Sequence, residues 1–235
     1  MLQHLFDLAA MSERQNRGID SDFLTPEEYS EFRHHEQEFS EYSVKVYSED
    51  QERKLLHFGP GSFQVAILRI DSKSHAFVKL QHPDYLGALI GLGLDRKVLG
   101  DILPDDRGAY LFVKESMAPF ILDQLTSVGR ASVSVSRRDD LPEEAQPKRQ
   151  ERELVVSSLR IDSMVAAFFR LSRGKAQKAI RSDCVFVDGS QELGTTTLLK
   201  EGNRVSLRHG GKFRYCSALR RTKKNSYVVL IEEYQ

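Results

Sequence analysis

The chain has 235 residues, enough for two domains or one large domain with a substantial core. Hydrophobic residues make up 40% of it, an ordinary share for a globular protein, and no run approaches the roughly 20 apolar residues of a membrane-spanning helix. The formal net charge of zero hides an asymmetry between two parts of the chain.

This asymmetry separates a basic part from an acidic part. Residues 155–235 hold 15 Lys and Arg against 7 Asp and Glu, a net charge of +8, and residues 1–154 carry a net charge of −8. A basic part in an otherwise acidic chain indicates a polyanion as its partner. We expect the acidic N-terminal part to supply shape or to contact a protein partner.

The cysteines and the first residues of the chain indicate in which cellular compartment the protein is found. Cys184 and Cys216 lie far apart with no ligand set near them, so they predict neither a zinc site nor a disulfide framework. The first residues lack the basic and apolar regions of a signal peptide. We therefore expect a cytoplasmic protein with no metal, no cofactor and no membrane insertion.

Residues 1–40 predict an N-terminal helical segment. Apolar side chains recur at helical intervals over residues 2–9. Thr25 followed by Pro26 and two acidic residues is typical of a helix start, because the threonine hydroxyl accepts from an unpaired backbone N–H and proline suits the first turn. We expect this second helix to run to about Phe39.

Residues 41–137 predict a mixed α/β domain. From Phe63 the order of expected elements is β-α-β-β-α-β, as in the ferredoxin-like unit that RNA-recognition motifs share. The helices are expected over residues 84–94 and from a Ser116 cap to Thr126. The run Arg107-Gly108-Ala109-Tyr110-Leu111-Phe112 resembles a base-stacking motif without its aromatic spacing, so its aromatic residues fit a structural sheet better.

An enzymatic alternative rests on Asp71. Arg69-Ile70-Asp71-Ser72 resembles the catalytic motif of pseudouridine synthases, but the Thr and Gly that should follow are absent. We place Asp71 in a turn after a strand and predict no catalytic residue. An RNA-modifying enzyme and a cell-division scaffold with incidental RNA binding remain the alternatives to a non-enzymatic RNA-binding protein.

Residues 138–153 are almost wholly polar, contain two prolines and predict a linker. A strand over residues 153–157 then leads into a domain over residues 154–235. Later in this domain, residues 212–215 alternate basic and aromatic side chains, which suits a strand with one packed face and one face toward phosphates.

The C-terminal domain begins with a pair of short helices. Apolar residues at helical spacing predict the first helix over residues 161–171, and Ser172 is a suitable N-cap for the second. Asp183 stands where a left-handed helix end is needed. In the second helix the apolar and cationic side chains fall on opposite faces, and a helix N-terminus with a cationic face suits phosphate.

This order of elements resembles the S-four RNA-binding domain, on the residues Arg160-Ile161-Asp162, Leu171-Ser172-Arg173, Ala176, Ile180 and Val185-Phe186-Val187-Asp188-Gly189. Asp183 and Cys184 stand where the S-four domain usually has glycine and a basic residue. We predict RNA contacts by Arg160, Ser172, Arg173, Lys175, Gln177, Lys178, Arg181, Lys212 and Arg214. A structural alternative stays open for Arg160 and Arg173, since either can pair with Asp162 inside the domain.

Longer stretches extend the resemblance to nearly the whole chain. Residues 81–93, Arg96 and residues 100–102, 108–110, 155–162 and 211–214 are similar to the bacterial YlmH family. This resemblance implies a helical N-terminal part, an RNA-recognition-like middle domain and a C-terminal S-four domain. It also implies a cytoplasmic protein that binds ribosomal RNA or tRNA on the large ribosomal subunit, with links to translation quality control and cell division.

Overall fold

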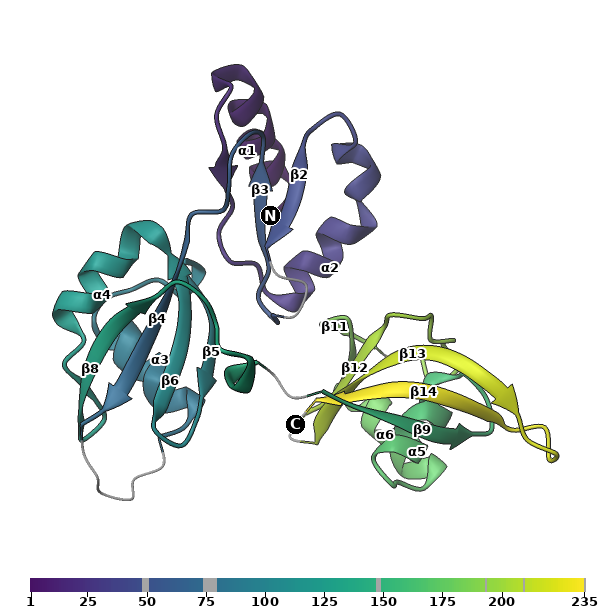
Figure 1. The fold of residues 1–235 in the computed structure, drawn as a ribbon. Helices are drawn as coiled ribbons and strands as arrows, with labels where there is room; N and C mark the ends of the chain where they lie inside the picture. Colours follow the sequence, from purple (N-terminus) through teal and green to yellow (C-terminus); the bar gives the residue numbers. More distant parts are fainter. Residues whose placement is uncertain (48–50, 74–79, 147–148, 193, 209, 235) are drawn as a thin grey trace. The chain divides into compact units, whose positions relative to one another are not determined.

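The computed structural model describes residues 1–47, 51–73, 80–146, 149–192, 194–208 and 210–234. The chain divides into two compact units, Met1–Gln146 and Pro147–Gln235. Both units combine helices with antiparallel sheets, so the fold class is α+β, as predicted (Figure 1). No helix in these described ranges is long and apolar enough to cross a membrane.

The first unit opens with two helices and a small sheet of order β1-β3-β2. Its elements are α1 (Leu2–Gln15), β1 (Ile19–Asp20), α2 (Pro26–His34), the 3₁₀ helix η1 (Glu36–Phe39), β2 (Val44–Tyr47) and β3 (Leu55–Phe58). The predicted start of α2 is confirmed: Glu28 N donates to the Thr25 hydroxyl at 3.2 Å, and Thr25 N donates to the Glu28 carboxylate at 2.8 Å. The α-helix ends at His34, earlier than the expected Phe39.

The strands β2 and β3 belong with the N-terminal helices, although the sequence predicts a separate domain from residue 41. All four residues of β3 are buried. The apolar faces of α1 and α2 need a partner, and β2 and β3 supply it. Their shared core contains Leu5, Ala9, Leu24, Phe32, Phe39, Leu56 and Phe58.

Residues 65–138 show the predicted β-α-β-β-α-β order, with one short strand added. The elements are β4 (Val65–Ser72), α3 (His82–Gly91), η2 (Arg96–Val98), β5 (Leu99–Pro104), β6 (Gly108–Lys114), η3 (Glu115–Met117), α4 (Ala118–Gln124), β7 (Ser127–Val128), β8 (Ala131–Arg138) and, after the sheet, η4 (Glu143–Ala145). The sheet order is β5-β6-β4-β8-β7, and its described pairs are antiparallel. Tyr85 and Leu89 of α3 and Ile121 of α4 pack in the core of this sheet.

Two local predictions in this part were wrong. Asp71 lies inside β4, where it pairs with Gly108 of β6, and not in a turn after the strand. Ser116 does not cap a helix: it lies in η3, and α4 starts after Met117 with no side-chain cap. Proline in the first turn of α4 has no N–H to satisfy, so one of the groups that a cap would serve is missing there.

The second unit is a six-stranded antiparallel sheet with two helices. Its elements are β9 (Arg149–Val156), α5 (Ile161–Phe168), α6 (Arg173–Arg181), β10 (Val185–Val187), β11 (Ser190–Gln191), β12 (Arg204–Leu207), β13 (Gly211–Arg221) and β14 (Tyr227–Tyr234). The sheet order is β11-β10-β12-β13-β14-β9. Both helices cover the same face of the sheet (Figure 1), and their apolar residues share a core with Phe213 and Tyr215 of β13.

The strand β9 starts earlier than the sequence predicts. Arg149 lies within the expected polar linker, yet it already pairs with Tyr234, and the ladder between β9 and β14 runs on to Val156. At the other end of the linker, β8 extends to Arg138. Residues 147 and 148 of the predicted linker lie outside the described residues.

Candidate nucleic-acid interface

The helix α6 presents a cationic face to solvent. Ser172 caps it as predicted, accepting from Lys175 N at 3.3 Å. Ala176 and Ile180 are fully buried against the sheet. Lys175, Lys178 and Arg181 are exposed, and none of the ion pairs or side-chain hydrogen bonds found among the described residues involves their side chains.

A buried carboxylate organises the other end of the helix pair. Asp162, in the first turn of α5, has a fully buried side chain. Its two oxygens accept from Arg160 at 3.2 and 3.0 Å and from Arg173 Nε at 3.1 Å. Gln177 Nε2 of α6 donates at 2.8 Å. Three side chains predicted to contact RNA therefore converge on one acidic residue.

This arrangement keeps the carboxylate charged. Burial would raise the pKa of Asp162, but the hydrogen bonds from Gln177, Arg173 and Arg160 outweigh burial and hold that pKa below its ordinary value. The one negative charge is shared by two guanidinium groups, so the cluster keeps a positive charge.

The two arginines of the cluster still reach solvent. The Arg173 side chain is 52% exposed and that of Arg160 is 31% exposed. Arg173 uses only Nε on Asp162, and its terminal nitrogens make none of the described hydrogen bonds. A guanidinium fixed at one edge is preorganised to bind an anion with the other. The structural pairing with Asp162 and a contact to phosphate are thus compatible.

Lys212 and Arg214 lie on the opposite face of the sheet from the helices. They alternate along β13 with Phe213 and Tyr215, which are buried in the core under α5 and α6. Arg214 is 3.7 Å from the Glu232 carboxylate of β14, and the Lys212 ammonium lies 5.1 Å from the centre of the Tyr234 ring.

The predicted contacts therefore form two groups, not one surface. The first consists of Arg160, Ser172, Arg173, Lys175, Gln177, Lys178 and Arg181 on the helix pair. The second is on the outer face of the sheet, where Arg149 and Arg204 join Lys212 around the Tyr234 ring. Sequence reasoning missed these two arginines because the strands that bring them to Tyr234 are far apart in the chain.

Asp71, the candidate of the enzymatic alternative, is engaged in an ion pair. Arg69 is 5% exposed, donates from Nε to Asp71 at 2.8 Å and binds Asp105 through both terminal nitrogens. Its guanidinium carbon also lies 4.6 Å from the centre of the Tyr110 ring. The one positive charge of Arg69 lies between these two carboxylates, so Arg69 holds the Asp71 side chain in place without cancelling the negative charge of the group. Within the described ranges, no group of three His, Cys, Asp or Glu residues is placed to hold a metal ion.

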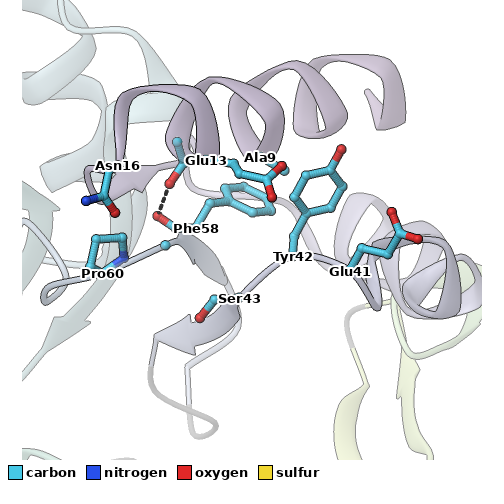
Figure 2. A pocket seen from close by; sticks show the side chains of 10 residues that line it. Ala9, Glu13, Asn16, Glu41, Tyr42, Ser43, Phe58 and Pro60 are labelled. Atoms are coloured by element: carbon cyan, nitrogen blue, oxygen red, sulfur yellow. Dashed lines mark hydrogen bonds between the residues drawn. The ribbon is translucent and has the colours of Figure 1, made fainter.

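The first unit has a shallow cavity of about 230 Å³ beside α1 and β3. Figure 2 shows the carboxylates of Glu13 and Glu41 at this cavity, with the Tyr42 and Phe58 rings between helix and strand. Two carboxylates repel phosphate, so this cavity does not suit RNA. It lies in the acidic part for which the sequence predicts a protein partner.

Comparisons with known proteins agree on a family. Residues 60–141 match a family model described as "Putative RNA-binding domain in YlmH". A protein of Bacillus subtilis (strain 168) named ribosome-associated protein quality control protein P2 is 34% identical over 158 residues, which is 66% of this chain. The matched region spans 61% of that relative's length. The names of these two matches describe RNA binding and quality control and not a catalysed reaction.

A solved structure named cell division protein ylmH from Streptococcus pneumoniae also aligns with the chain, at 22% identity and a TM-score of 0.49. The alignment covers 58% of this chain and 88% of that one. The domain match over residues 60–141 and the B. subtilis relative together confirm the resemblance to the YlmH family seen in the sequence.

Proposed function

We propose that this protein is a non-enzymatic adaptor that binds structured RNA on the large ribosomal subunit, namely ribosomal RNA with or without tRNA. The observation that carries the proposal is the exposed cationic face of α6 beside the Asp162 cluster. Phosphate binding by such a face releases counterions and needs no further chemistry from the protein. The net charge of +8 on residues 155–235 also favours binding to RNA.

Within this proposal the two folded parts have different assignments. Residues 65–138 form a ferredoxin-like, RNA-recognition-like domain, supported by the element order and by the antiparallel sheet order β5-β6-β4-β8. The C-terminal unit is an S-four domain, supported by the helix pair followed by the hairpin of β10 and β11 at Asp188 and Gly189.

The relative supports a proposal for the cellular setting. The B. subtilis protein is named for ribosome-associated quality control, and we extend that role to this chain, acting in the cytoplasm. A part in cell division remains a weaker proposal. A protein partner would contact the acidic residues of the first unit, beside the cavity lined by Glu13 and Glu41.

The test is a salt titration of binding to purified large-subunit ribosomal RNA. Each of Lys175→Ala, Lys178→Ala and Arg181→Ala should reduce the slope of log affinity against log salt by roughly 0.7 to 0.9, because each removes about one phosphate contact. Arg14→Ala is the matched control, since Arg14 is exposed in α1 of the acidic unit. An unchanged slope in all three variants would show that this face of α6 is only solvated surface.

The RNA itself is identified by cross-linking in cells. Enrichment of one ribosomal RNA site supports the adaptor. Recovery of messenger RNA, or of no RNA, favours a scaffold in which RNA binding is incidental.

A further inference from the structure

The turn between β13 and β14 carries a basic tip. Residues 217–226 contain Arg220, Arg221, Lys223 and Lys224 and no acidic residue. All four cations are exposed. The strand β9 ends at Val156, opposite Tyr227, so the turn lies beyond the last pair of the sheet on that side. In Figure 1 this hairpin forms the end of the C-terminal sheet.

The tip is an ordered turn. Thr222 N donates to Ser226 O at 2.8 Å, and Asn225 N donates to Thr222 O at 2.9 Å. Asn225 takes the left-handed conformation with a φ of 62°, and the Thr222 hydroxyl accepts from Ser226 N. Side chains on such a turn are displayed from a defined backbone, which lowers the entropic cost of binding.

Two of the four cations have structural roles. Arg220 forms two hydrogen bonds with the Glu153 carboxylate of β9, at 3.0 and 2.7 Å. The Arg221 guanidinium lies 4.4 Å from the centre of the Tyr227 ring and donates to Asn225 at 2.6 Å. These contacts fix the base of the tip against its neighbouring strands.

The other two cations have no such role. Lys223 and Lys224 make none of the ion pairs or side-chain hydrogen bonds found among the described residues. Charges along an exposed edge strand often prevent pairing with a further strand. That reason does not apply to these two lysines, because they stand in the turn, where no strand could pair.

We infer that this basic tip is a second contact for the RNA backbone, separate from the cationic face of α6. The inference rests on the proposed RNA binding and adds a site to it. Helical RNA is recognised by its shape and its phosphates, because side chains cannot read its deep, narrow major groove. A narrow hairpin tip with two solvent-directed ammonium groups fits phosphates along such a groove.

The size of the effect follows from counterion release. One phosphate contact changes log affinity by roughly 0.7 to 0.9 for each tenfold change in salt. Between 1 M and about 0.1 M salt, each contact is therefore worth roughly five- to eightfold in affinity. Losing Lys223 and Lys224 together should weaken binding by about 25- to 60-fold at the lower salt.

The experiment uses the full chain and purified large-subunit ribosomal RNA. Lys223→Ala with Lys224→Ala should lower the salt slope by roughly 1.4 to 1.8. Lys223→Arg with Lys224→Arg should keep it, because the charge is retained. The control, Arg14→Ala with Arg17→Ala, removes the same charge from exposed positions of the acidic unit. Circular dichroism checks that each variant is folded.

The outcomes separate this inference from the proposed function. If the α6 variants lower the slope and the tip variants leave it unchanged, the tip is not an RNA contact and the inference is overturned. If only the tip variants lower the slope, the tip is an RNA contact and the α6 face is not. A loss in the arginine variants as large as that in the alanine variants would also overturn the inference, since charge would then not be the cause.

Discussion

Asp162→Asn tests whether one buried carboxylate holds the helix pair together. Asparagine has nearly the same volume but no charge, and it places an NH2 group at one of the two oxygen positions. Oδ2 alone accepts three hydrogen bonds, from Arg160, Arg173 and Gln177. Two of these come from charged donors, and a hydrogen bond to a charged group contributes about 1.5 to 3 kcal/mol.

The expected loss is smaller than the sum of these bonds. Arg160 and Arg173 are partly exposed and can turn their charge to water in the variant. We expect a loss of about 3 kcal/mol of local stability, to which the unsatisfied Gln177 amide and the weakened arginine bonds contribute.

The assay is hydrogen exchange of the α5 and α6 amides in the full chain, which reports the free energy of opening of these helices. The control is Asp183→Asn, the same substitution at an exposed residue of the same unit, where asparagine also tolerates the left-handed backbone. The control should change the opening free energy by less than about 0.5 kcal/mol. If Asp162→Asn costs no more than this control, the carboxylate does not hold the helices and our account of the cluster is wrong.

The same carboxylate predicts a pH dependence. Because its pKa is lowered in the folded protein, its contribution is complete above the ordinary carboxyl pKa of about 3.9 and is lost as the pH falls through the folded value. The difference in opening free energy between the natural chain and Asp162→Asn should therefore stay constant near neutral pH and shrink below about pH 4.

Two further predictions concern autonomy and catalysis. A fragment of residues 147–235 should fold alone and bind RNA. A fragment of residues 154–235 should be much less stable, because it lacks most of β9 and leaves β14 as an exposed edge. Thermal melts by circular dichroism compare the two fragments, and equal melting temperatures would contradict the role of β9. Asp71→Asn should leave the nucleoside composition of ribosomal RNA unchanged, because Asp71 is a strand residue held in place by Arg69; nucleoside chromatography coupled to mass spectrometry that finds a missing pseudouridine in the variant's RNA would refute the non-enzymatic assignment.

The features that the sequence predicts well are local. The cap at Thr25 is made with a residue three positions away, as is the Ser172 cap. Asp183 takes the left-handed conformation, with a φ of 58°, because the chain must leave α6 within a single turn. In each case the determining contact lies within a few residues, so the residue pattern is enough.

The structural features that the sequence does not predict depend on residues far apart in the chain. Residues 149–152 look like a linker because their side chains are polar, but Arg149 and Arg152 find carboxylates on β14, at Glu232 and Glu233. At Asp162, the sequence allows pairing with Arg160 and Arg173 as an alternative, but it misses the bond from Gln177, which lies 15 positions away on the other helix. A pattern read along the chain shows the right residue types but not that they meet.

The pairing of β9 with β14 bears on how the second unit folds during synthesis. The strand β9 (Arg149–Val156) is the first of the second unit to be synthesised, and its partner β14 (Tyr227–Tyr234) is the last. It therefore stays unpaired until almost the whole unit has been made. Until then its apolar residues Leu154 and Val156 have no completed sheet to pack in. Contacts between such distant segments slow folding and leave an edge open to wrong partners. We expect the Arg and Glu residues of β9, which make the segment resemble a linker, to oppose aggregation of the strand while it is unpaired.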